Sequence, residues 1–119
     1  MSNKESNNTA GDSTPNTEPC IFCDIIDGKL PCSKVYEDDY VLAFHTLSPI
    51  MPGHTLVIPK IHVRNIIDCD AGTLGYVMAI VQKLAQDFIK SGKKSVKIIQ
   101  NNEEPHQEVF HLHFHVIPY

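Results

Sequence analysis

The sequence lacks several features that define large classes of proteins. It contains no tryptophan, and none of its apolar runs approaches the roughly 18 residues of a membrane-spanning helix. Its first residues hold no apolar segment like that of a secretion signal. Lysine and arginine number only 10 against 14 acidic residues, so a basic surface for nucleic acid is not indicated. We therefore expect a protein that binds neither membranes nor nucleic acid and resides in the cytoplasm, or also in the nucleus of a eukaryotic cell.

Four cysteines occur in the 119 residues. In a protein that is not exported they are expected to stay reduced, which favours metal binding or redox chemistry over disulfides. Cys20 and Cys23 form a Cys-x-x-Cys pair, which is compatible with half of a metal site, a redox pair or chance. Cys32 and Cys69 have no partner at ligand spacing, so we interpret them as ordinary thiols of the core or surface.

The first 19 residues contain no valine, leucine, isoleucine or aromatic residue. Such a segment buries too little apolar surface to offset the entropy lost on ordering, so residues 1–19 are predicted to be a disordered tail. Residues 20–119 then form one domain. About 100 residues is a small core, and oligomerisation often supplements a core of this size.

Two helices follow from the apolar spacing. Residues 71–91 repeat apolar side chains at i, i+3, i+4 and i+7, with Asp70 as a plausible N-cap and Gly92 just past the end. A shorter helix is predicted from Ile21 and ends before Gly28.

Four strands are predicted around the long helix, over residues 40–45, 54–58, 95–99 and 109–117. The connections between neighbouring strands are mostly short enough for hairpins. This order favours an α+β domain with an antiparallel sheet over a parallel βαβ arrangement.

Three histidines alternate with apolar residues near the end of the chain: His111, His113 and His115. Because side chains of a strand point to alternate faces, a strand here places the imidazoles in one row about 7 Å apart. Such a row suits a catalytic zinc with an open position or a structural zinc shared with cysteines. It also suits attack on phosphorus by a neutral imidazole. The pattern alone leaves these three chemistries open.

The segment His111-Leu-His-Phe-His-Val-Ile117 resembles the signature of the histidine triad (HIT) family. Further blocks agree in order along the chain: 20–26, 35–39, 42–44, 52–60, Asn101 and 107–110. The resemblance implies a HIT-like fold in which a five-stranded antiparallel sheet continues across a homodimer. It also implies binding of purine nucleotides and cleavage of nucleoside phosphoramidates or related AMP and GMP adducts.

The resemblance also assigns roles to individual residues. His113 would attack the α-phosphorus and form a nucleotidyl-histidine, His115 would contact the phosphate and assist proton transfer, and His54 matches an additional active-site histidine. The remaining residues that the resemblance implies around the base, ribose and phosphate are Ile21, Phe22, Ile25, Phe44, His45, Thr46, Leu47, Gln100, Gln107 and Glu108.

Relatives that keep the two N-terminal cysteines imply a structural zinc. Its ligands would be Cys20, Cys23, His62 and the first triad histidine, His111. Four protein ligands leave no open position for a reacting water, so this interpretation weakens the catalytic-zinc alternative.

The chain departs from the family pattern near the expected phosphate and ribose. Thr46 stands where aspartate is usual, which predicts weaker or altered ribose recognition, and Gln100 stands where asparagine is usual. The loop 102–106, with Glu103 and Glu104, replaces a glycine-rich one, and we interpret both carboxylates as solvated. His106 is either a new ligand contact or an exposed loop histidine, and we favour the second.

Two further functions remain as alternatives to a HIT hydrolase. One is a non-catalytic module that binds a nucleotide or protein through the same fold, with chemistry lost through the changes at Thr46 and the loop. The other is a catalytic zinc hydrolase, whose activity would disappear with a chelator while the fold survives.

Overall fold

The computed structural model describes residues 19–119, so all of the predicted tail but Pro19 lies outside the described residues. Within them neither helix is long and apolar enough to cross a membrane. The elements in chain order are α1 (Ile21–Ile26), β1 (Lys34–Glu37), β2 (Val41–His45), β3 (Thr55–Pro59), α2 (Ala71–Lys90), β4 (Val96–Ile99) and β5 (Phe114–Pro118).

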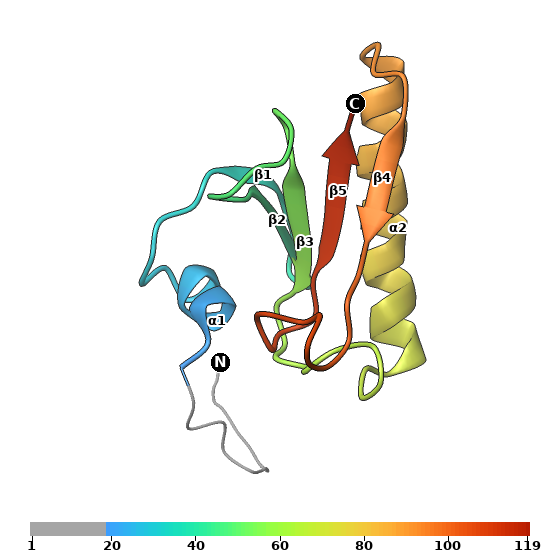
Figure 1. Ribbon diagram of the computed structural model, residues 1–119. Helices are drawn as coiled ribbons and strands as arrows, with labels where there is room; N and C mark the ends of the chain where they lie inside the picture. The colour runs from blue at the N-terminus through green and yellow to red at the C-terminus, as the bar shows by residue number, and fades with distance from the viewer. Residues whose placement is uncertain (1–18) are drawn as a thin grey trace.

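The five strands form one sheet in the order β1-β2-β3-β5-β4, and every neighbouring pair is antiparallel. The predicted α+β class with an antiparallel sheet is therefore confirmed. The long helix connects β3 to β4, and β5 then returns between them (Figure 1).

The two helices lie on opposite sides of the sheet (Figure 1). Strand alternation explains this arrangement, because Val41, Ala43 and Val57 pack against α2. The even-numbered residues between and beside them pack toward α1, namely Leu42, Phe44, Leu56 and Ile58. Phe22 of α1 is buried in the second of these clusters. The α1 face of the sheet also borders the cleft described below.

The ends of α2 are as the sequence predicts. The Asp70 carboxylate accepts a hydrogen bond from the backbone N–H of Thr73 at 2.9 Å, as an N-cap does. After the last turn Gly92 adopts φ +104°, a left-handed conformation that glycine takes without a Cβ clash.

Two expectations about the strands are wrong. The hydrophobic pattern did not predict β1, whose residues are mostly exposed and lack a clear apolar face. The last strand begins at Phe114 and not at residue 109, because the preceding segment pairs elsewhere: the Leu112 N–H donates to the Val63 carbonyl at 2.8 Å. Only His115 of the three histidines therefore lies in a strand, and they do not form one continuous row.

Candidate active site and metal centre

A cleft of about 560 Å³ opens on the α1 side of the sheet. Its apolar walls come mainly from α1 and the end of β2, including Phe22 and Phe44, while its polar groups come from histidines and from the chain after β4. No lysine or arginine stands among the described residues that line it. The cleft is lined by Ile21, Phe22, Ile25, Phe44, Thr46, Leu47, Ser48, Ile50, His54, Leu56, Ile99, Asn101, His106, Glu108, Val109, His113 and His115.

Most residues that the sequence assigns to substrate line this cleft, and three do not. His45 is exposed with its ring beside the Ser33 hydroxyl, Gln100 hydrogen-bonds to Asn102, and Gln107 is buried in a separate polar network. Seven lining residues were not assigned to substrate from the sequence, namely Ser48, Ile50, Leu56, Ile99, Asn101, His106 and Val109. Of these, Leu56, Asn101 and Val109 carried a signal, as part of the family pattern.

His54 and His115 form a directed hydrogen-bonded pair in the cleft. The Nδ1 atom of His54 accepts from the backbone N–H of Ile50 at 3.1 Å, so a neutral His54 carries its proton on Nε2. That Nε2–H lies 2.9 Å from Nδ1 of His115 and donates to it. A neutral His115 therefore carries its own proton on Nε2, as a donor.

His113 has the opposite arrangement. Its Nδ1–H donates to the backbone carbonyl of His111 at 2.8 Å, which leaves Nε2 as an unprotonated nitrogen with a free lone pair. The ring centroids of His113 and His115 are 5.2 Å apart. One ring thus offers a nucleophile and the next offers a proton donor.

The four predicted metal ligands also meet in space. One ligand atom from each of Cys20, Cys23, His62 and His111 lies within 4.8 Å of all the others. The Cys20 Sγ–His111 Nδ1 distance is 3.4 Å and the Cys23 Sγ–His62 Nδ1 distance is 3.3 Å. Tetrahedral zinc with its usual bond lengths separates its ligand atoms by about 3.3–3.8 Å, so this donor set fits such an ion.

His111 is oriented for this cluster. Its Nε2–H donates to the Pro59 carbonyl at 2.9 Å, so its lone pair on Nδ1 faces the cysteines. The hydrogen bond from the Cys23 thiol lowers the pKa of the Cys20 thiol, while the same hydrogen bond and burial raise the pKa of Cys23. A divalent cation would stabilise both thiolates.

The three triad histidines thus belong to two sites. His111 faces the metal cluster, whereas His113 and His115 face the cleft. Phe22, which lies between the two cysteines in α1, packs edge-on against both sites, with ring centroids 5.8 Å from His111 and 5.1 Å from His113.

The sequence profile of the HIT domain matches residues 27–119. The chain belongs to the HIT family. It is 42% identical over 105 residues to Protein hit of Bacillus subtilis, covering 85% of this chain and 71% of that protein. It is 37% identical over 100 residues to the adenosine 5′-monophosphoramidase hnt1 of Schizosaccharomyces pombe, covering 83% and 73%. Among solved structures, a zinc-bound histidine triad protein from Mycobacterium smegmatis superposes with a TM-score of 0.79 at 34% identity, covering 83% and 73%.

Burial keeps His54, His113 and His115 of this HIT protein neutral at pH 7. Desolvation lowers the pKa values of His54 and His113. Desolvation and the neighbouring His113 and His54 rings lower the pKa of His115 to about 4. The hydrogen-bond directions above therefore apply at neutral pH.

The lowered pKa of His115 predicts a pH dependence of stability. Between pH 6.5 and about 4 the unfolded chain binds a proton at this residue and the folded chain does not. The free energy of unfolding should therefore decrease as the pH is lowered from 6.5 to about 4. His115→Asn should make the fall shallower, because asparagine does not titrate. Urea unfolding of the wild type and of His115→Asn at pH 7.5, 5.5 and 4.5 measures the difference in the free energy of unfolding between them. Both proteins carry the same metal cluster, so its contribution cancels in this difference. Parallel curves would contradict the burial of a neutral His115.

Proposed function

We propose that the protein is a HIT hydrolase that cleaves purine nucleoside phosphoramidates through a covalent intermediate on His113. The observation that carries the proposal is the pair of opposite protonation patterns in one cleft. The His111 carbonyl leaves Nε2 of His113 free to attack, and His54 leaves Nε2–H of His115 free to donate. The S. pombe relative named adenosine 5′-monophosphoramidase supports the substrate class.

The first step transfers the nucleotide to the enzyme. Nε2 of His113 forms a bond to the α-phosphorus and the P–N bond breaks, while the leaving nitrogen accepts a hydrogen bond from Nε2–H of His115 and takes up one proton from solvent. His113 becomes cationic in this step, and its Nδ1–H remains on the His111 carbonyl. His115, whose ring is centred 5.2 Å from that of His113, stays neutral and keeps its proton on Nε2.

The second step releases the nucleotide. Water attacks the same phosphorus, the bond to His113 breaks, and one proton of the water is released to solvent. His113 then regains its lone pair on Nε2. One water is consumed for each free amine and nucleoside monophosphate formed.

Hydrolysis of adenosine 5′-phosphoramidate at pH 7 tests this function. We expect AMP and ammonia to appear in equal amounts, and isothermal titration calorimetry to show AMP binding. A folded protein that binds AMP without turnover would instead favour the non-catalytic module.

The apolar walls of the cleft suit the purine base. Phe22 and Phe44 lie with their rings 5.7 Å apart, and Ile21 and Leu47 are exposed beside them. A slot of apolar side chains with polar groups at one end is typical of nucleotide sites. We place the base at this wall and the phosphate at the histidines.

Thr46 is proposed to weaken recognition of the ribose. Its hydroxyl lines the cleft and accepts a hydrogen bond from the Ser48 N–H at 3.2 Å. In Thr46→Asp, one carboxylate oxygen can keep that bond while the other accepts from a ribose hydroxyl. We expect the ratio of affinities for AMP and 2′,3′-dideoxy-AMP to rise about tenfold. Calorimetry with both ligands measures it, and an unchanged ratio would place Thr46 away from the ribose.

We propose that the cluster of Cys20, Cys23, His62 and His111 binds a structural zinc. The donor set and spacing fit, and the M. smegmatis relative is described as zinc-bound. When bound, the ion would supply a fixed link between α1 and the chain on either side of α2. With four protein ligands it would have no position for a reacting water.

We also propose a homodimer in the cytoplasm. The strand β4 ends the sheet, and Ile98 on it and Ile89 of α2 are 41% and 50% exposed. An uncovered edge strand with apolar neighbours is suited to pairing with a second copy. All four cysteines are free thiols, which suits a reducing compartment.

A further inference from the structure

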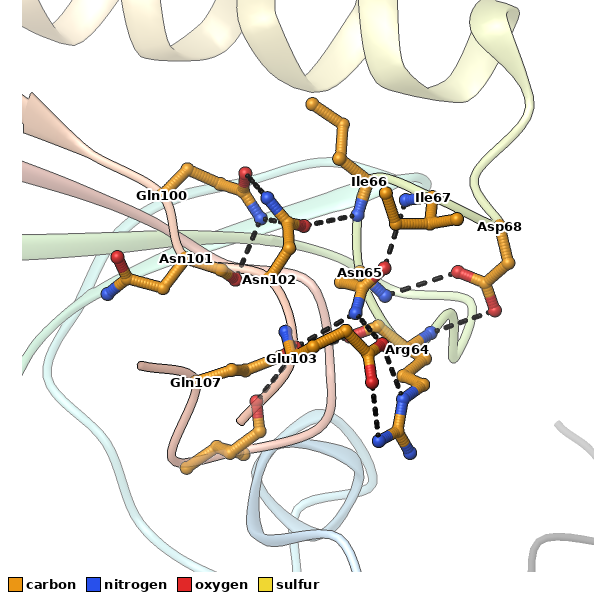
Figure 2. Close-up of polar contacts among 11 residues, drawn as sticks. Arg64, Asn65, Ile66, Ile67, Asp68, Gln100, Asn101, Asn102, Glu103 and Gln107 are labelled. Atoms are coloured by element: carbon orange, nitrogen blue, oxygen red, sulfur yellow. Dashed lines mark hydrogen bonds and ion pairs between the residues drawn. The ribbon is translucent and has the colours of Figure 1, made fainter. Parts of the chain in front are cut away.

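The loop after β4 is tied to the loop after β3 by a polar network (Figure 2). The Glu103 carboxylate accepts from the Arg64 guanidinium at 2.8 and 3.0 Å and from the amide of Asn65, which is only 1% exposed. Beyond it, the Asn102 Oδ1 atom accepts from the Ile66 N–H at 2.9 Å. Glu103 is exposed, as the sequence suggests, but its carboxylate is also held by Arg64 and Asn65.

The amide of Gln107 is fully used within this network. Its Oε1 atom accepts from the Asn65 amide at 2.9 Å and from the Glu103 N–H at 2.8 Å. Its Nε2 group donates to the carbonyls of Arg64 at 2.7 Å and Val109 at 3.0 Å. With both acceptor sites and both donors occupied, Gln107 has no group left for a ligand in the cleft.

The backbone at Glu103 turns the loop toward the cleft. Its φ of +69° is a left-handed conformation that non-glycine residues rarely adopt, so the surrounding contacts must hold it. Its carbonyl accepts from the N–H groups of His106 at 3.2 Å and Gln107 at 3.0 Å. The result is a tight turn after which the His106 side chain lines the cleft and the Gln107 side chain does not.

The position of His106 is favourable for binding an anion. The only other residues of this loop segment at the cleft are Asn101, Glu108 and Val109, and no lysine or arginine is among the described lining residues. His106 is thus the one histidine among the described lining residues that the proposed catalytic steps do not use.

We propose that His106 donates a hydrogen bond to the phosphate of the bound nucleotide and that Glu103 positions it through the network with Arg64 and Gln107. This inference rests on the proposed function and assigns a specificity role to the loop. His106 acts in binding, and Glu103 acts only through the loop.

Calorimetry with AMP and adenosine tests the role of His106. We expect His106→Ala to weaken AMP binding about tenfold, the scale of one hydrogen bond to a charged group, and to leave adenosine binding within about twofold. Glu104→Ala is the matched control, since Glu104 is exposed on the same loop and outside the cleft. Equal AMP affinities of the wild type and His106→Ala would overturn the inference. No AMP binding by the folded wild type would instead overturn the proposed function.

A double-mutant cycle tests the role of Glu103. We expect Glu103→Ala to weaken AMP binding but not adenosine binding, and to add little when His106 is already alanine. Glu103→Gln, which keeps an acceptor for Asn65, should recover part of the affinity and serves if the alanine variant does not fold. Additive effects on AMP, or equal losses for AMP and adenosine, would contradict a positioning role.

Discussion

Replacing His113 by alanine is expected to lower the rate of adenosine 5′-phosphoramidate hydrolysis by at least about 10³-fold. The variant loses the imidazole whose Nδ1–H donates to a backbone carbonyl and whose Nε2 lone pair is thereby left free in the cleft. Water would have to attack the phosphorus directly, without a covalent intermediate. Initial rates of AMP release at saturating substrate, for wild type and variant, measure the effect.

AMP affinity is the control for this experiment. His113 is 8% exposed and its ring contacts Phe22, so alanine leaves a small space in the cleft without removing its apolar walls. We expect AMP to bind His113→Ala within a few-fold of the wild-type affinity. A variant that keeps more than about a tenth of the wild-type rate would show that His113 is not the nucleophile.

Removing the metal is expected to destabilise the protein strongly. The four proposed ligands come from three separate segments, and Cys20 and His111 are buried. Without a cation, the free energy of metal binding no longer stabilises the folded arrangement of these segments. The charges of the two cysteine thiolates are then no longer neutralised by the ion. We expect a strong chelator to lower the melting temperature by more than about 10 °C. Calorimetric melting curves, with metal content measured in parallel, test this.

Cysteine variants separate this effect from nonspecific action of the chelator. Cys23→Ser should reproduce the loss of stability, whereas Cys69→Ser, half-buried and outside the cluster, should not. Activity should fall only as the protein unfolds. A chelated protein that keeps its melting temperature but loses turnover would instead support a catalytic metal.

The helices and the central strands could be predicted because their residues follow simple periodicities. The helix α2 carries its apolar face and both end signals within its own sequence. Strand β1 could not be predicted in this way, because its place in the sheet depends on pairing with β2 and not on burial of its own side chains. The late start of β5 depends on a distant partner, the Val63 carbonyl.

The candidate site shows the same division. The histidines and the Cys-x-x-Cys pair could be predicted as site residues from the sequence, because these residue types are rare and regularly spaced. It could not show that Gln107 turns into the Asn65 network while His106 turns to the cleft, because this depends on contacts between two loops far apart in sequence. Nor could it show which nitrogen of each histidine is free, since backbone carbonyls and N–H groups decide that.

The most direct test of the account is to look for the covalent intermediate. Protein mixed rapidly with adenosine 5′-phosphoramidate, quenched with base within one turnover and digested, should show one adenylyl group on the peptide that contains His113, analysed by tandem mass spectrometry. A fragment series that places the group on His113, absent from His113→Ala, is the predicted result. Full turnover with no adenylylated peptide at any quench time, or with the group on another residue, would contradict it.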